Sequence, residues 1–222
     1  MRFSPDHDVK VLLPDGSTRP LDMYLIPGAL LMLSALVLMI SMFLPYWSMT
    51  MTAPQYPKGL RVDVYVNHLE GDMREIDELN HYLGMPSLDE GGRLERSVSM
   101  IAIVVLGLLL MGGVFIHNQA AGMLALPVLA WPFMFLADLW WILYKYGHSI
   151  DPESALGGAI EAFTPPLFGK GMVGQFGTIA RPEIGLWLAF VALGLTLLGL
   201  WFHRVAYKPV VDARQRKQGT SS

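Results

Sequence analysis

The chain has 222 residues, of which 53% are hydrophobic and 16% are charged. Its mean hydropathy is positive, which is too apolar for a soluble domain of this length and predicts a membrane protein. Cysteine is absent, so disulfides, thiolate metal sites and cysteine nucleophiles are excluded. The net charge is −3 and no basic stripe is interleaved with aromatic residues, so nucleic acid is not an expected partner.

Residues 1–23 form a polar N-terminal segment that is too long for the short basic start of a secretory signal. The helix that follows is therefore expected to remain attached to the protein. Within the polar segment, "VKVLL" followed by "PDGS" predicts a small hairpin at the inner membrane surface.

Four segments are long and apolar enough to cross about 30 Å of hydrocarbon, which takes roughly 20 helical residues. We expect these transmembrane helices at 24–47, 97–117, 122–144 and 184–203. The predicted fold class is membrane α-helical, with four transmembrane helices and a small extracytoplasmic α+β cap. Membrane lipid is accordingly an expected partner.

The C-terminal tail, 204–222, carries five basic residues against the single acid Asp212. Positive charge close to a membrane helix marks its cytoplasmic end. With four helices, both termini are then cytoplasmic, and the connections 48–96 and 145–183 face the periplasm of a bacterial inner membrane. Only the short turn at 118–121 returns inside.

The first long connection, 48–96, has the patterns of a folded segment. Residues 60–69 alternate valines with polar side chains, which predicts a half-buried strand. A helix is expected to follow, with Asp72 as its N-cap and Gly84 and Pro86 at its end. One face of that helix combines four residues, Met73, Ile76, Asn80 and Leu83.

The second connection, 145–183, is rich in glycine and proline. This composition predicts an ordered loop with one helical turn at 152–162.

Three stretches carry a family resemblance: "APQYPKGLRVDVYVNHLEGD", "IDELNHYLGM" and "YKYGHSIDPESAL" with "FTPPLFGK". They resemble the outer segments of NosB-type multi-helix membrane proteins, which are encoded beside the second lineage of nitrous-oxide reductases. The resemblance covers both long connections, and it covers the helices only as hydrophobic pattern. It implies an association with the assembly of a periplasmic copper enzyme or with its electron supply.

Three histidines of the long connections, His68, His81 and His148, form a candidate metal set together with Met85. Imidazole and thioether groups suit Cu(I), so copper is the one cofactor that these side chains suggest. Asp77, four residues before His81, is placed to orient its ring as a second-shell carboxylate. No tight ligand spacing accompanies the set, which favours the alternative that His81 makes a buried hydrogen bond in a cap and His148 caps its helix.

Methionines also mark the start of the first connection, where "SMTMT" places Met49 and Met51. Clustered thioethers could bind Cu(I), but methionine is also an adaptable core side chain.

Asp138 is the one formal charge inside a predicted span. An acid within a membrane is costly and is a candidate functional residue, here for a quinol or a proton. A hydrogen bond to an outer-loop residue is the simpler interpretation, because Asp138 lies about two turns from the end of its helix.

Motifs for phosphate binding, nucleophilic catalysis, haem ligation and metalloprotease chemistry are not found in the sequence, so an enzyme is not expected. The expected function is a non-catalytic accessory protein or subunit that supports a periplasmic copper enzyme of the nitrous-oxide reductase type by docking, maturation or electron supply. A protein partner is expected on the periplasmic side or within the membrane. Its candidate anchors are four aromatic residues, Tyr56, Tyr65, Phe163 and Phe168. The alternatives are a quinol-interacting subunit of a respiratory complex and a structural subunit of another membrane complex.

Overall fold

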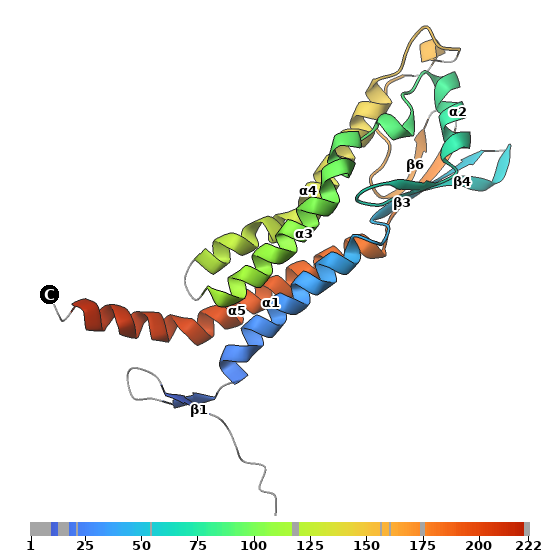
Figure 1. The fold of residues 1–222 in the computed structure, drawn as a ribbon. Coiled ribbons are helices and arrows are strands. Elements are labelled where there is room, and N and C mark those ends of the chain that lie inside the picture. Colours follow the sequence, from blue (N-terminus) through green and yellow to red (C-terminus); the bar gives the residue numbers. More distant parts are fainter. Residues whose placement is uncertain are drawn as a thin grey trace, which may run out of the picture. The chain divides into compact units, whose positions relative to one another are not determined.

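The computed structural model describes eight segments of the chain, namely 10–12, 18–20, 22–53, 55–116, 120–155, 157–159, 161–173 and 176–219. These residues fall into two compact units. The first unit comprises Met1–Leu36, Leu106–Leu129 and Val191–Ser222, and the second comprises Val37–Val105 and Ala130–Phe190. Four long helices contribute residues to both units, whereas the main sheet lies wholly in the second unit (Figure 1).

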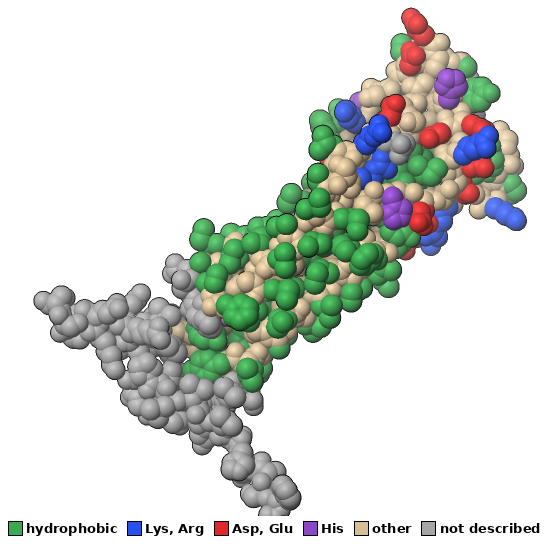
Figure 2. All heavy atoms as spheres, viewed as in Figure 1, with side chains coloured by type: hydrophobic (Ala, Val, Ile, Leu, Met, Phe, Trp, Pro, Cys, Tyr) green, Lys and Arg blue, Asp and Glu red, His purple; other side chains and the backbone are tan. Residues whose placement is uncertain are grey.

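The four long helices are α1 (Asp22–Ser41), α3 (Arg93–Phe115), α4 (Ala120–His148) and α5 (Ile184–Gly219). Each contains a stretch long and apolar enough to cross a membrane, with mean hydropathies from 1.8 to 2.6. The four predicted helices are therefore confirmed as candidate membrane spans. Figure 2 shows hydrophobic side chains over these helices and charged side chains over the sheet and the short helix α2 (Met73–Leu83).

Helix ends differ from the sequence prediction in all four helices. Helices α3 and α4 span Arg93–Phe115 and Ala120–His148 instead of 97–117 and 122–144, and the largest differences are at the ends of α1 and α5. Helix α1 ends at Ser41 rather than at 47, because Pro45 interrupts the helical pattern and the chain enters a strand at Trp47. Helix α5 continues past its span to Gly219, so the basic tail is helical as far as that residue. Arg, Lys and Gln are good helix formers, which agrees with this extension.

In the first unit, α1 and α5 are joined by buried hydroxyl groups. Ser34 Oγ lies 2.7 Å from Thr196 Oγ1 and donates to the carbonyl oxygen of Ala192 at 2.6 Å. Small hydroxyl side chains allow membrane helices to approach closely and to hydrogen-bond to each other.

The N-terminal segment contributes two short strands, β1 (Lys10–Leu12) and β2 (Thr18–Pro20), which pair antiparallel. The predicted hairpin is thus confirmed at its strands, while its "PDGS" turn lies outside the described residues.

The sheet of the second unit has five antiparallel strands in the order β5-β4-β3-β7-β6. They are β3 (Trp47–Ala53), β4 (Tyr56–Val64), β5 (Leu69–Gly71), β6 (Gly169–Val173) and β7 (Phe176–Pro182). The central strand β3 places Met49 opposite Val62 of β4 and opposite Ala180 of β7. The two long connections, far apart in the sequence, therefore build one sheet.

The predicted strand at 60–69 is only partly correct. Strand β4 begins earlier, at Tyr56, and ends at Val64. The chain then turns, with the Tyr65 N–H donating to the His68 carbonyl oxygen at 3.0 Å, and returns as β5.

The second connection also differs from prediction. Its helical turn is a three-residue 3₁₀ helix at Gly157–Ala159, and strands β6 and β7 stand where a loop was expected.

Helix α2 follows the prediction closely, between Asp72 and Gly84. Gly84 has a left-handed backbone with φ of 72°, and Ile76, Asn80 and Leu83 are buried. The Asp72 carboxylate does not cap its own helix, however. It accepts a hydrogen bond of 2.8 Å from the Arg61 N–H, which ties the start of α2 to β4.

Side chains of the sheet, α2 and α4 form the core of the second unit. Met49 and Met51 are buried there with Val62, Ile76 and Leu139. The two methionines therefore act as core side chains.

Candidate functional site

A cavity of about 420 Å³ lies within the second unit, between the sheet, α2, the start of α3 and the second half of α4. Apolar side chains make up most of its wall, among them Val62, Ile76, Phe135, Leu139 and Leu143. Its volume falls in the range of roughly 300–1,000 Å³ that is typical of pockets for small organic ligands.

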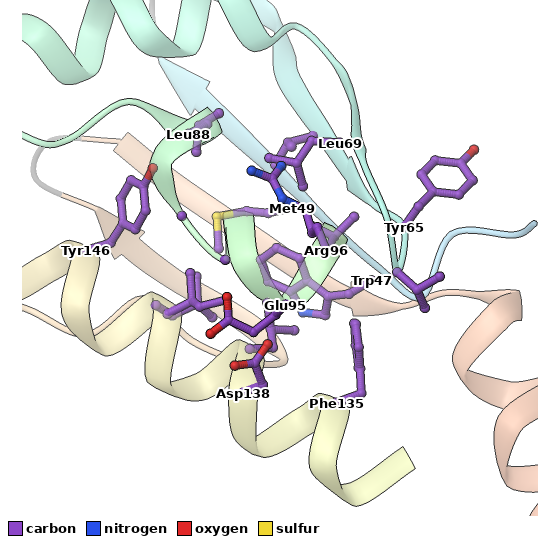
Figure 3. A pocket seen from close by; sticks show the side chains of 18 of the residues that line it. Trp47, Met49, Tyr65, Leu69, Leu88, Glu95, Arg96, Phe135, Asp138 and Tyr146 are labelled. Atoms are coloured by element: carbon purple, nitrogen blue, oxygen red, sulfur yellow. The ribbon is translucent and has the colours of Figure 1, made fainter. Parts of the chain in front are cut away.

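Two carboxylates stand on the wall of this cavity. Glu95 comes from the first turn of α3, and Asp138 comes from α4. Figure 3 shows the two carboxyl groups directed toward one another, and their charges interact. No hydrogen bond joins Asp138 to another residue within the described part of the chain, so the expected bond to an outer-loop residue is not found.

Asn80 is, with Ser99, one of two buried polar side chains among the described residues of the cavity wall. It is 6% exposed, and its backbone carbonyl accepts a hydrogen bond from the Met85 N–H at 2.8 Å. Its side-chain Nδ2 has no hydrogen-bond partner among the described residues. A buried amide donor without a partner is uncommon in folded proteins and needs an explanation.

Other polar groups on the wall are paired. Ser99 Oγ donates to the Val66 carbonyl oxygen at 2.5 Å, and Trp47 Nε1 donates to the Leu167 carbonyl oxygen at 2.6 Å. The Tyr146 hydroxyl donates to the Ser87 carbonyl oxygen. These bonds hold the sheet, α3 and α4 at the wall of the cavity.

The turn before α3 fits closely against α4. A Cβ atom at Gly91 would lie 2.7 Å from the Tyr146 ring, and one at Gly92 would lie 2.7 Å from Ile142. Gly92 also has a positive φ of 62°. Two glycines are therefore needed for this approach, which brings Glu95 beside Asp138.

Tyr46 anchors the entry of the chain into the sheet. Its hydroxyl lies 2.7 Å from Ser41 Oγ and accepts a hydrogen bond of 3.3 Å from Trp131 Nε1. Burial raises the pKa of the Tyr46 phenol above its ordinary value. Because Trp131 also lines the cavity, this contact positions part of the wall.

His81 and Met85, from the predicted copper set, line a shared surface hollow with Ser149 and Asp151. His81 is exposed, and its ring contacts Tyr82 edge-on at 6.3 Å between centroids. The buried hydrogen bond expected for His81 in the alternative interpretation is therefore wrong, because the side chain lies at the surface.

The His68 side chain contacts its near neighbours in the sequence, around the turn from β4 to β5. Its ring nitrogens lie 2.8 Å from Asn67 Oδ1 and 3.1 Å from Glu70 Oε1, and the ring stacks on Tyr65 at 4.3 Å.

His148 is held at the end of α4, where Nδ1 lies 2.8 Å from the Tyr144 carbonyl oxygen and the ring stacks on Tyr144 at 4.0 Å. Neither His68 nor His148 lines the hollow of His81. Over the segments that the structure describes, no three His, Asp or Glu residues lie close enough to share a metal ion.

Asp77 does not orient the ring of His81, which was its predicted role. Its Oδ1 accepts a hydrogen bond of 2.7 Å from the Leu88 N–H, so it fixes the chain that leads to α3. It shares a shallow surface depression with His81, and no bond between the two is found in the described structure.

The four candidate partner anchors differ in exposure. Phe168 is 44% exposed, whereas Tyr56, Tyr65 and Phe163 are partly buried. Tyr56 packs against the core of the second unit, and the Phe163 backbone bonds to the end of α4.

The positions of Glu95 and Asn80 on the cavity wall were not predicted from sequence. In the sequence, Asn80 stands on the same helical face as apolar residues that are buried in α2. A polar side chain on such a face is the signal that could have directed attention to it. Glu95 is an acid in the first turn of α3. Helices α3 and α4 follow one another in the sequence, so an antiparallel arrangement would place the start of α3 near the second half of α4, which contains Asp138.

Models of known protein families give no match to this chain, and no curated protein is significantly similar to it.

Proposed function

We propose that this protein is a non-catalytic subunit of the bacterial inner membrane that docks a partner protein on its periplasmic side. The docking part is the cap, which we define as the main sheet together with α2. In this proposal both termini are cytoplasmic, as the basic tail of α5 favours. The observation that carries the proposal is the exposed apolar edge of the sheet at β6.

Strand β6 pairs only with β7 among the described strands, so its outer backbone groups face away from the sheet. Phe168 stands just before this strand and Met172 within it, with exposed fractions of 44% and 66%. An open strand edge flanked by large apolar side chains invites a further strand or an apolar surface of a partner.

The edge strand β6 is fixed to the rest of the sheet through its neighbour β7. Strand β7 pairs with β3 over six successive residue pairs, and β3 follows directly from α1. A partner bound at β6 would thus be fixed to the ends of two membrane helices, α1 and α5, through β3 and β7.

The resemblance of the long connections to NosB-type proteins suggests the identity of the partner. We propose a periplasmic copper enzyme of the nitrous-oxide reductase type, which this subunit supports by docking, maturation or electron supply. Copper binding at His81 and Met85 is a separate part of the proposal, and it requires a further ligand from the partner or from elsewhere in the chain.

The test is co-purification in mild detergent from a strain that produces the copper enzyme. Phe168→Ala combined with Met172→Ala should reduce the amount of copurified copper enzyme at least tenfold. Tyr82→Ala is the matched control, because Tyr82 is 60% exposed on α2, outside the β6 edge. Equal recovery of the copper enzyme with the double variant and the wild type would refute the docking edge.

A further inference from the structure

The cavity of the second unit can be reached from the side that α3 and α4 would present to lipid. Val98 and Met134 both line the cavity, lie within candidate membrane spans, and are 50% and 59% exposed. A ligand that dissolves in the bilayer would meet these residues first. The occupant is therefore expected to be a membrane-soluble molecule with a largely apolar body.

The polar groups of the wall define what the head of such a molecule must offer. The Asn80 amide nitrogen is a buried donor that has no partner among the described residues, and a small shift of its side chain toward the cavity would pair it with an acceptor oxygen. Glu95 and Asp138 are acceptors when ionised, and two adjacent carboxylates favour a neutral hydrogen-bond donor between them.

The common membrane lipids do not match the hydrogen-bonding groups and charges of this wall. A simple acyl chain leaves the Asn80 donor unpaired. A phospholipid brings an anionic phosphate to a wall where the described charged residues are Glu95, Asp138 and Arg96, so the phosphate meets a net negative charge. A hydroquinone satisfies each demand, since its hydroxyl groups both donate and accept, its ring is neutral, and its prenyl tail is apolar.

We propose that this cavity binds a membrane hydroquinone, with hydroxyl groups directed to Asn80 and to the Glu95–Asp138 pair. Aromatic side chains from two elements, Trp47 of β3 and Trp131 and Phe135 of α4, provide flat walls for the ring. The prenyl tail leaves past Val98 and Met134 toward the bilayer. This site is separate from the docking edge at β6, because none of the described side chains of β6 lines the cavity.

The experiment uses the full-length protein in detergent, titrated anaerobically with decylubiquinol and with a short-chain menaquinol. Binding is followed by tryptophan fluorescence, since Trp47 and Trp131 line the cavity, and by calorimetry. Ala102→Phe should fill the cavity and weaken binding at least tenfold. Ile101→Phe is the matched control, because Ile101 is the adjacent residue, is 67% exposed and does not line the cavity.

A second variant is included because Ala102→Phe could lose binding by misfolding. Asp138→Asn keeps the size of the side chain and removes a charged acceptor, so it should also weaken binding of the hydroquinone. Circular dichroism and the melting temperature should be unchanged by this substitution.

Palmitic acid serves as a competitor that has an apolar chain without a hydroquinone ring. Wild-type affinity in both cavity variants would overturn the proposal, as would palmitic acid binding as tightly as the quinols. Undiminished recovery of the copper enzyme with the Phe168→Ala/Met172→Ala double variant, with quinol binding intact, would instead count against the β6 edge alone.

Discussion

Gly147 offers a sharp test of how the second connection packs on α4. A Cβ atom at this position would lie 1.7 Å from the Phe163 carbonyl oxygen and 2.7 Å from its carbonyl carbon. The same two residues are joined by a hydrogen bond of 3.1 Å from the Phe163 N–H to the Gly147 carbonyl oxygen. The chain at Phe163 therefore crosses directly over the glycine, and Gly147→Ala must displace backbone atoms.

The size of the effect follows from two opposing contributions. Overpacking in a well-packed region costs about 1–3 kcal/mol, and here the clash is with backbone, so the upper end applies. Alanine stabilises a helix by about 1 kcal/mol relative to glycine, which offsets part of the loss. We expect Gly147→Ala to lower the free energy of unfolding by about 2 kcal/mol.

Gly112→Ala is the matched control, because Gly112 is also helical and a Cβ atom there meets nothing within 4 Å. It should leave stability unchanged or raise it by up to about 1 kcal/mol. The assay is denaturant or thermal unfolding in mild detergent, with limited proteolysis of the connection at 149–168 as a local readout. If Gly147→Ala were as stable and as protease-resistant as Gly112→Ala, the packing described for Phe163 would be incorrect.

Three other predictions concern the anchor, the orientation and the copper hypothesis. Tyr46→Phe should lower the free energy of unfolding by about 1–2 kcal/mol, because the Trp131 N–H loses its acceptor, whereas Tyr82→Phe at an exposed ring should have no effect in the same unfolding assay. A cysteine at Ser87 should react with an impermeant thiol reagent on intact spheroplasts and one at Ser221 should not; the reverse pattern would overturn the orientation. His81→Ala should leave stability unchanged because the side chain is exposed, so an anaerobic Cu(I) titration against a chelator tests metal binding alone, and identical curves for variant and wild type would eliminate copper at His81.

The helices could be predicted because their signals are local. A run of about 20 apolar residues identifies a membrane span without reference to the rest of the chain. The end of α2 was predicted for the same reason, since Gly84 supplies a left-handed residue and Pro86 follows it.

The sheet could only partly be predicted, because two of its five strands, β6 and β7, depend on pairing with a distant part of the chain. Strand β6 reads "GKGMV" and β7 reads "FGTIARP", and neither has clear alternation or strong β-propensity. Their stability comes from β3, which lies more than 100 residues earlier in the chain and pairs with β7 from Trp47 opposite Pro182 to Thr52 opposite Gly177. Glycine and proline, which predict a loop locally, are tolerated here by the paired neighbour.

Asp138 was singled out for its cost within a membrane helix, and the structure supplies a physical reason why that cost can be met. The residue lies on the wall of a cavity beside Glu95, near the end of the helix pair, and not against a continuous apolar surface. A carboxyl in such a position can accept a hydrogen bond from a ligand. The proposed hydroquinone would pair both with this carboxyl and with the Asn80 amide, which has no partner among the described residues, so one occupant would account for two polar groups.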